Sequence, residues 1–263
     1  MMSGLVSVIM PSFNTAPYIA ESIRSVMAQT YTDWELIIVD DASTDNTGDV
    51  VSSLMSSRTS SAITNSSNIH YLKNDRNRGA AYSRNRALRE AKGKWIAFLD
   101  SDDLWNPDKL EKQIAFMEKN GYAFSYTRYG EMDENGNPTR TTVSGPKHIT
   151  KTGMFNYCWP GCLTVMYDRE VVGDIQIAEI QKNNDYAMWL KICREADCYL
   201  LDENLATYRK RTGSISNHSY MALIKWHYKL YREAEGMNPV ASLFNTGRNL
   251  FFGVWKKIKY VKR

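Results

Sequence analysis

The sequence lacks any long hydrophobic run, and this absence limits where the protein can work. No stretch approaches the roughly 18 to 20 uncharged apolar residues that cross a bilayer. The amino terminus also has no basic region followed by an apolar signal core. We therefore expect a cytoplasmic protein. Its 263 residues, 43% of them hydrophobic, are enough for one domain or two half-domains around a substantial core.

Cysteine is scarce as well. Four cysteines in 263 residues are too few for a disulfide framework, so we expect reduced thiols. Their inner spacings, C-x3-C and C-x4-C, miss the tighter loops of common zinc sites, and no histidine lies at a matching interval. The pattern therefore disfavours structural zinc. The four residues are Cys158, Cys162, Cys193 and Cys198.

Several common functional motifs are also absent. The sequence has no G-x-x-x-x-G-K-[ST], no G-x-G-x-x-G after a strand, no H-E-x-x-H and no G-x-S-x-G. A P-loop enzyme, a Rossmann dehydrogenase or a hydrolase is therefore disfavoured.

Charge is unevenly distributed along the chain. The net charge is +4, but residues 245–263 hold six basic residues and no acid, so the remainder carries −2. A nearly neutral body with a cationic tail argues against broad nucleic-acid binding, which would spread basic residues over one face. It favours a localised contact with something anionic.

Four short apolar runs alternate with helical segments in the first 110 residues. They cover residues 5–10, 34–39, 69–72 and 95–99. This alternation predicts a mostly parallel α/β sheet with helices on both faces. Beyond residue 110 the rhythm weakens, and we expect a more irregular second half packed on the same sheet. The turn at residues 133–138 suits a hairpin or a long loop.

Acidic residues follow two of these runs. Asp40 and Asp41 end the second, and Asp100-Ser101-Asp102-Asp103 follows WIAFL. Ligands of open parallel sheets bind beyond the carboxyl ends of the strands, so both clusters point to one crevice. A helix cap or solvated loop explains one such pair alone. Two clusters together would repel unless a cation lay between them, and oxygen ligands suit Mg²⁺ or Mn²⁺. Such a cation would also neutralise a bound diphosphate.

The chain resembles the family 2 glycosyltransferases of the GT-A fold, of the type that builds bacterial polysaccharides and lipid-linked oligosaccharides. Residues 6–47 and 77–103 are similar to the family's nucleotide-binding half. The later segments NNDYAMWLKI and YRKRTGSIS are similar to its E-D-Y-x-x-W-L and Y-R-x-x-x-x-S elements. The resemblance implies a nucleotide-sugar-binding half at 1–110 that is continuous with an acceptor-binding half at 111–220. A basic, amphipathic helical tail would follow at 221–263.

The resemblance also implies roles for individual residues. Asp41 would accept a hydrogen bond from the uracil imide, and Asp100 would approach the ribose. Asp102 would bind the metal, Mn²⁺ or Mg²⁺, while Asp40 and Asp103 would be structural. Arg76 and Arg84 are alternatives to Arg78 as the basic contact. The nucleotide-binding residues are expected to be Pro11, Ser12, Phe13, Asp41, Arg78 and Asp100.

Asp185 corresponds to the family's general base. Asn184 stands where an acidic residue commonly precedes that base, which is a departure from the pattern. An aspartate before Tyr186 also suits a helix cap. Trp159 and Trp189 are candidates for stacking on a sugar, although tryptophan among apolar neighbours is often core.

Together these roles imply an inverting transferase. Asp185 would take the proton of an acceptor hydroxyl while its oxygen displaces a nucleotide diphosphate, from a UDP-sugar, at the anomeric carbon. A loop with Arg209, Lys210 and Arg211 could add positive charge on closure. Two alternatives stay open: a nucleotidyltransferase, and a catalytically silent scaffold subunit that keeps the nucleotide site.

The tail combines an apolar stripe with lysines. Such a helix suits the interface of an anionic membrane, and we predict a peripheral enzyme on the inner face of the cell membrane that uses residues 246–263. A helix packed on the body with solvated lysines is the alternative. The stripe comprises Leu250, Phe251, Val254, Trp255, Ile258 and Val261.

Overall fold

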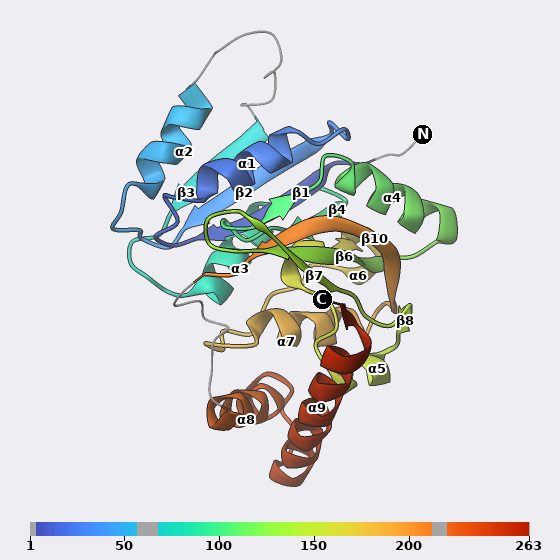
Figure 1. Ribbon diagram of the computed structural model, residues 1–263. Coiled ribbons are helices and arrows are strands. Elements are labelled where there is room, and N and C mark those ends of the chain that lie inside the picture. Colours follow the sequence, from blue (N-terminus) through green and yellow to red (C-terminus); the bar gives the residue numbers. More distant parts are fainter. Residues whose placement is uncertain (1–3, 57–67, 212–219, 263) are drawn as a thin grey trace.

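One mixed β-sheet runs through the molecule (Figure 1). The computed structural model describes residues 4–56, 68–211 and 220–262, and within them eleven strands join this sheet. The main strand order is β11-β7-β6-β9-β4-β1-β2-β3, and β10 adds to β6, β5 and β8. The strands are β1 (Val6–Ser12), β2 (Trp34–Asp40), β3 (Ile69–Lys73), β4 (Trp95–Phe98), β5 (Leu104–Trp105), β6 (Phe124–Met132), β7 (Pro138–Val143), β8 (His148–Ile149), β9 (Met166–Asp168), β10 (Cys198–Arg209) and β11 (Val261–Lys262).

Helices cover both faces of this sheet, as the α/β pattern predicts. Apolar residues of α1, α2 and α4 pack on one face, and those of α3 and α7 pack on the other. The helices are α1 (Ile19–Met27), α2 (Thr47–Ser56), α3 (Ala80–Glu90), α4 (Lys109–Asn120), α5 (Lys151–Asn156), α6 (Arg169–Val172), α7 (Asn184–Ile192), α8 (Tyr220–Lys229) and α9 (Pro239–Lys259).

The parallel half lies where the four apolar runs predict it. Strands β3, β2, β1 and β4 are parallel neighbours. Every residue of β1, β2 and β4 is buried, because helices cover both sides of this half, and such strands read as continuous apolar runs. Their carboxyl ends therefore meet at one edge.

The second half of the chain extends the sheet beyond β4 and reaches the loop that follows β4. Strand β9 runs antiparallel to β4 and β6, and β6 and β7 form a hairpin, which settles the alternatives for residues 133–138. The long strand β10 pairs in parallel with β6 along most of its length. It carries Arg209 to the loop that follows β4, where the backbone N–H of Arg209 donates to Asp103.

The carboxyl-terminal segment forms α8, a π-helical turn at Leu230–Ala234, and α9. Asn238 caps α9 by accepting a hydrogen bond from the Ala241 N–H, and Pro239 occupies the first turn, where its missing N–H costs nothing. The helix ends at Lys259, so the predicted stripe is too long by one member: Val261 lies in β11, paired with β7. No helix among the described residues has the length and apolar character to cross a membrane.

Candidate active site

The predicted uracil pocket begins where β1 ends. Pro11 and Ser12 are the last, buried residues of that strand, and the Ser12 hydroxyl shares a 2.7 Å hydrogen bond with Thr15. Phe13 follows with its ring 43% exposed, an unusual exposure for an aromatic residue at a buried strand's end. The ring is therefore available for stacking on a planar base.

The two aspartates after β2 have different environments. Asp40 is fully buried and accepts hydrogen bonds from the Tyr71 hydroxyl at 2.5 Å and the Ser43 N–H at 2.8 Å, which makes it a support for the loop. Asp41 instead holds the segment before α3. It accepts from the Asn74 amide at 2.7 Å and from the Gly79 N–H at 2.6 Å.

The backbone of Arg78, not its side chain, reaches Asp41. The Arg78 N–H lies 2.9 Å from one Asp41 oxygen, while the guanidinium stacks 4.2 Å above the Tyr82 ring on the surface. Arg78 is thus held beside the predicted base-binding loop with its charge turned towards the neighbouring helix. Sequence reasoning missed Asn74, because an isolated asparagine in a basic loop carries no pattern.

Arg84 links the loop that follows β4 to the start of α7. Its guanidinium is buried and lies 2.5 Å from Asp100 and 2.8 Å from the Asn184 side-chain oxygen. Sequence alone does not choose among Arg76, Arg78 and Arg84 as the basic contact, and the structure distinguishes Arg84 by its buried contacts. The one available signal is its place among the small and apolar residues on the buried face of α3.

Asp102 lies in a crowded acidic environment. Burial raises its pKa, and the negative charge of Asp100 raises it further. The Arg211 Nε atom lies 2.6 Å from an Asp102 oxygen and opposes this rise. A cationic group therefore already balances this carboxylate.

A divalent ion fits this position. Among the described residues, no three His, Cys, Asp or Glu side chains gather into a closed metal cage. Magnesium sites are commonly built from one or two carboxylates completed by substrate phosphates, so Asp102 with Asp100 nearby is a suitable protein contribution. The Arg211 guanidinium supplies positive charge at the same carboxylate.

Asp103 and Arg209 join the loop that follows β4 to the end of β10. Asp103 is buried and accepts the Arg209 backbone N–H at 2.9 Å. The Arg209 guanidinium donates to the Asp102 carbonyl oxygen and pairs with Glu21 at 2.6 Å. Arg209 is thus a structural clamp, whereas the predicted charged loop continues past Arg211 into residues outside the described part of the chain.

Asp185 lies in the first turn of α7, and its pKa is raised. Asn183, in the left-handed conformation with φ 57°, is the cap of this helix, so the capping alternative for Asp185 is wrong. Burial raises the pKa of Asp185, and the nearby Arg84 guanidinium partly opposes that rise. The Asp185 carboxylate therefore binds a proton more readily than a surface aspartate does, which suits a proton acceptor.

The two tryptophans proposed for sugar stacking belong to the core. Trp189 is fully buried and packs edge-on against Phe98. Trp159 is also buried, donates its indole N–H to the Gly153 carbonyl, and packs edge-on against Phe252. Neither ring face is open to a ligand, because neighbouring aromatic side chains already cover it.

Comparison with known proteins gives a consistent family. The model of the family described as "Glycosyl transferase family 2" matches residues 7–171. The chain is 40% identical over 235 residues to the "putative teichuronic acid biosynthesis glycosyltransferase TuaG" of Bacillus subtilis, covering 89% of this chain and 90% of that protein. It is 36% identical over 254 residues to WfgD of Escherichia coli, covering 96% and 94% respectively. WfgD is named as a UDP-Glc:alpha-D-GlcNAc-diphosphoundecaprenol beta-1,3-glucosyltransferase.

Solved structures share the fold. Residues 1–349 of TarS from S. aureus, in complex with UDP-GlcNAc, superpose with a TM-score of 0.71 at 22% identity, covering 97% of this chain and 76% of that one. The mannosyltransferase PcManGT from Pyrobaculum calidifontis, in complex with GDP-Man and Mn²⁺, gives a TM-score of 0.64 at 18% identity and covers 92% and 68%. The GT-A fold expected from the sequence is confirmed.

Proposed function

The chain belongs to glycosyl transferase family 2, and on that premise we propose that it inverts the anomeric centre of a UDP-sugar while transferring the sugar to an acceptor hydroxyl. The observation that carries the proposal is the buried Arg84 bridge. One guanidinium contacts Asp100 on the donor side and Asn184, next to Asp185, on the acceptor side. The predicted base is therefore tied to the predicted nucleotide site.

The reaction is a single displacement. Asp185 accepts the proton of the acceptor hydroxyl as the oxygen forms a bond to the anomeric carbon. The bond between that carbon and the diphosphate oxygen breaks, and its electron pair leaves on the nucleoside diphosphate. Attack opposite the leaving group inverts the configuration.

The donor side would hold the nucleotide through several contacts. Phe13 stacks on the base, Pro11 and Ser12 shape its pocket, and Asp41 accepts from the imide by sharing an oxygen that now receives backbone N–H groups. Asp100 lies on the ribose side, and Arg78 flanks the loop.

Asp102 would hold Mn²⁺ or Mg²⁺, which supplies positive charge beside the diphosphate when bound. The Arg211 guanidinium, 2.6 Å from Asp102, would add further positive charge at this position. Positive charge beside the diphosphate favours departure of the leaving group.

The acceptor is proposed by likeness to the relatives. WfgD is named for glucose transfer to a GlcNAc-diphosphoundecaprenol, and TuaG for teichuronic acid synthesis. We assign this chain a lipid-linked or polysaccharide acceptor in cell-surface glycan synthesis, and a peripheral position on the inner face of the membrane. The basic segment 246–263 would contribute to that position.

A donor panel tests the proposal. Purified protein with Mn²⁺ is given UDP-, GDP- and TDP-sugars with and without a synthetic lipid-diphosphate-linked GlcNAc, and product formation is followed by mass spectrometry. Transfer from a UDP-sugar with inverted configuration is expected. Nucleotide binding without turnover would favour the silent scaffold, and pyrophosphate release would favour nucleotidyl transfer.

The scaffold alternative is weakened by the position of Asn184. Its side-chain oxygen accepts a hydrogen bond from Arg84, so it has a defined structural partner despite its departure from the acidic pattern. Because asparagine is neutral, it does not offset the positive charge of Arg84, which acts on Asp100 and Asp185.

A further inference from the structure

Helix α9 packs on the body with a mostly polar side, from which Phe252 also packs on Trp159. Within the helix the buried residues are all polar, and they comprise Ser242, Asn245, Thr246 and Asn249. The Asn249 amide donates to the Tyr186 hydroxyl at 3.1 Å, and Arg248 donates to Asn156 and to the Thr152 carbonyl. These contacts fix the helix in one rotation about its axis.

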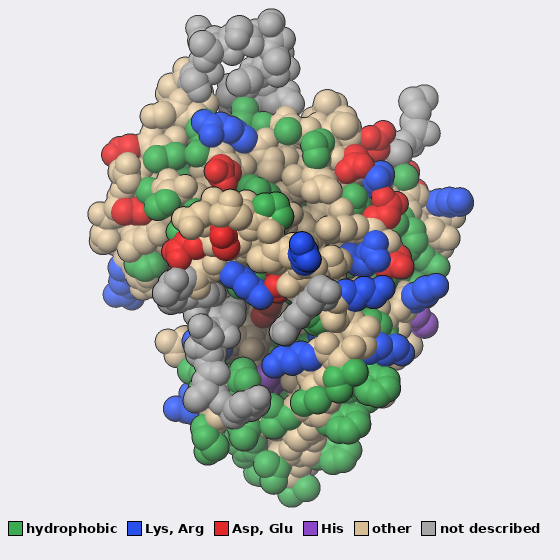
Figure 2. All heavy atoms as spheres, viewed as in Figure 1, with side chains coloured by type: hydrophobic (Ala, Val, Ile, Leu, Met, Phe, Trp, Pro, Cys, Tyr) green, Lys and Arg blue, Asp and Glu red, His purple; other side chains and the backbone are tan. Residues whose placement is uncertain are grey.

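The opposite side of α9 is apolar and faces outward. Seven large apolar residues, spaced at three and four positions along the helix, are 44–79% exposed. We call them the outer face of α9: Val240, Leu243, Phe244, Phe251, Val254, Trp255 and Ile258. Figure 2 shows hydrophobic side chains covering the end of the molecule where α8 and α9 lie in Figure 1. A contiguous apolar surface of this kind marks an interaction site.

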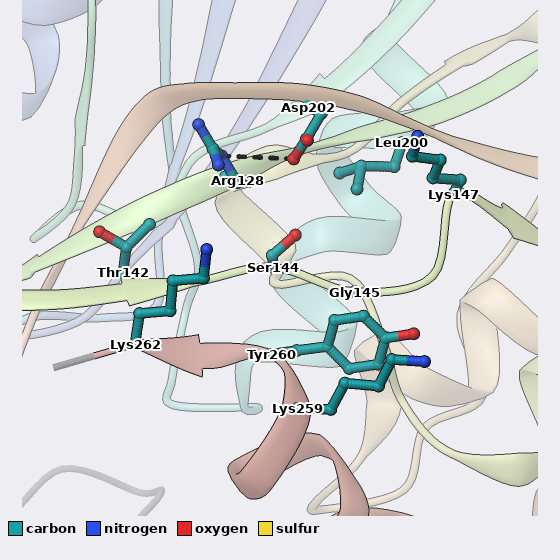
Figure 3. A pocket seen from close by; sticks show the side chains of 10 residues that line it. All are labelled: Arg128, Thr142, Ser144, Gly145, Lys147, Leu200, Asp202, Lys259, Tyr260 and Lys262. Carbon is teal, nitrogen blue, oxygen red and sulfur yellow. Dashed lines mark ion pairs between the residues drawn. The ribbon is translucent and has the colours of Figure 1, made fainter.

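A basic pocket begins where the outer face ends. It has a volume of about 360 Å³ and lies between β7, β10 and the segment that joins α9 to β11. Lys259, the residue after Ile258, is part of its wall. The charged residues that line it are Arg128, Lys147, Lys259, Lys262 and a single acid, Asp202. In Figure 3, Arg128 and Asp202 lie on one side of the pocket, opposite Tyr260 and Lys262.

The charge of the pocket is only partly balanced. Arg128 Nε lies 3.4 Å from an Asp202 oxygen, which leaves three lysines against no further carboxylate among the lining residues. A cavity of this size that is lined by several cationic groups suits a phosphate-bearing ligand. The Ser144 hydroxyl and the Tyr260 ring also line the cavity.

We infer that the outer face of α9 and the basic pocket form one bilayer-docking surface. The outer face enters the boundary between headgroups and acyl chains, and the pocket takes the phosphate of an anionic lipid headgroup. Apolar insertion beside lysines is the pattern of helices that lie in a membrane interface. The inference deepens the proposed membrane position and names the surface responsible.

Charge favours a bilayer over a second copy of the chain. Residues 236–263 contain no acid, and exposed Lys257, Lys259 and Lys262 flank the outer face. In a two-fold dimer the same patch meets itself, so these lysines would oppose lysines. An anionic lipid surface attracts each of them instead.

Vesicle sedimentation tests the outer face. Full-length protein is mixed with phosphatidylcholine vesicles, with or without phosphatidylglycerol. The double variant Phe251→Gln/Ile258→Gln should partition at least about tenfold less to both kinds of vesicle. Each apolar side chain that inserts into the bilayer contributes strongly to the free energy of binding. Val171→Gln, an exposed apolar residue elsewhere on the surface, is the matched control and should bind like wild type.

A second pair of variants tests the pocket. Lys147→Gln/Lys262→Gln should lower binding to phosphatidylglycerol vesicles about thirtyfold, from about fivefold for each lysine, and leave binding to phosphatidylcholine unchanged. The control Lys92→Gln/Lys119→Gln removes the same charge at exposed sites outside the pocket. It should have little effect on binding to either kind of vesicle.

Three outcomes would overturn the inference. One is equal vesicle binding by wild type and the outer-face variant, and another is a stable dimer in light scattering that Phe251→Gln dissociates. The third is a pocket variant that raises the KM for a lipid-linked acceptor without changing vesicle binding. Transfer to a detergent-free, water-soluble acceptor should occur with wild type and persist in all variants. Its absence in wild type would count against the proposed enzyme and leave the docking surface standing, whereas its loss in a variant alone would show damage to the fold.

Discussion

At the residue scale, burial governs the expected behaviour of Asp185. We predict that Asp185→Asn keeps donor affinity and loses turnover by about two to four orders of magnitude, the range for removal of a general base. Binding is measured by titration calorimetry with UDP and Mn²⁺, and turnover by product formation. A variant that no longer binds the donor would instead reveal a structural role.

The same residue sets the direction of the pH profile. The base works when deprotonated, and burial raises its pKa, so kcat/KM should fall as pH drops through that raised value. Arg84→Gln removes the positive charge that opposes the rise. The acidic limb of the profile should therefore move to higher pH, a shift that a purely structural effect on the fold would not produce. An unchanged limb would separate Arg84 from the base.

Asp102 offers a test of metal use. Asp102→Asn should abolish Mn²⁺-dependent UDP binding and transfer. The melting temperature should stay nearly unchanged, because the amide has the same shape as the carboxylate and removes its repulsion from Asp100. Asp174→Asn, whose side chain is 90% exposed, serves as the control. Full turnover by Asp102→Asn would remove the argument for a metal at this carboxylate.

Sequence motifs single out individual residues but do not reveal contacts made across the fold. Asp102 and Asp185 stand in recognisable motifs, and their roles stay predictions. The bridge from Arg84 to Asn184 spans 100 positions, and only tertiary folding brings the two together. The prediction that Trp159 and Trp189 stack on a sugar was wrong, because an aromatic residue near a motif is indistinguishable in sequence from one that fills the core.

At the scale of elements, removal of the tail should destabilise the body. Truncation after Asn245 deletes Phe252 and Tyr260, which pack on Trp159, and strand β11, which pairs with β7. Loss of two packed rings costs about 3 kcal/mol or more, which corresponds to a fall in melting temperature of at least about 6 °C. Calorimetry checks this. An unchanged melting temperature would show that the tail is an independent anchor.

Helix α9 also shows what periodicity leaves open. The spacing of apolar residues predicted an apolar stripe from the sequence, but a stripe is equally compatible with packing inward or facing outward. The polar residues decide the orientation here, since Asn249 and Arg248 find their partners on the body. The helix therefore packs on the body, as one of the two alternatives expects, with its apolar side exposed. Contact of the tail with a membrane stays a prediction.

At the scale of the whole molecule, the parallel half of the sheet was predictable and the remainder was not. Local runs specify β1 to β4, whereas β9 and β10 join the sheet through pairings between distant segments. The division at residues 110 and 220 stays a prediction. The sheet itself continues across the first of these positions, from β4 through β9 to β6.

If α9 docks on a bilayer as proposed, the contact between α9 and α7 would set the height at which an acceptor hydroxyl is reached. The outer face of α9 and the Tyr186 hydroxyl lie on opposite sides of one helix, and Asp185 adjoins Tyr186. A helix with its side chains is about 10 to 12 Å thick, so under the proposed docking the predicted base would stand at least one helix thickness above the lipid plane. Glycans with few sugars next to the lipid diphosphate would place their terminal hydroxyl at this height, and long chains would overshoot it. The enzyme would thus select an early step of chain assembly by depth alone.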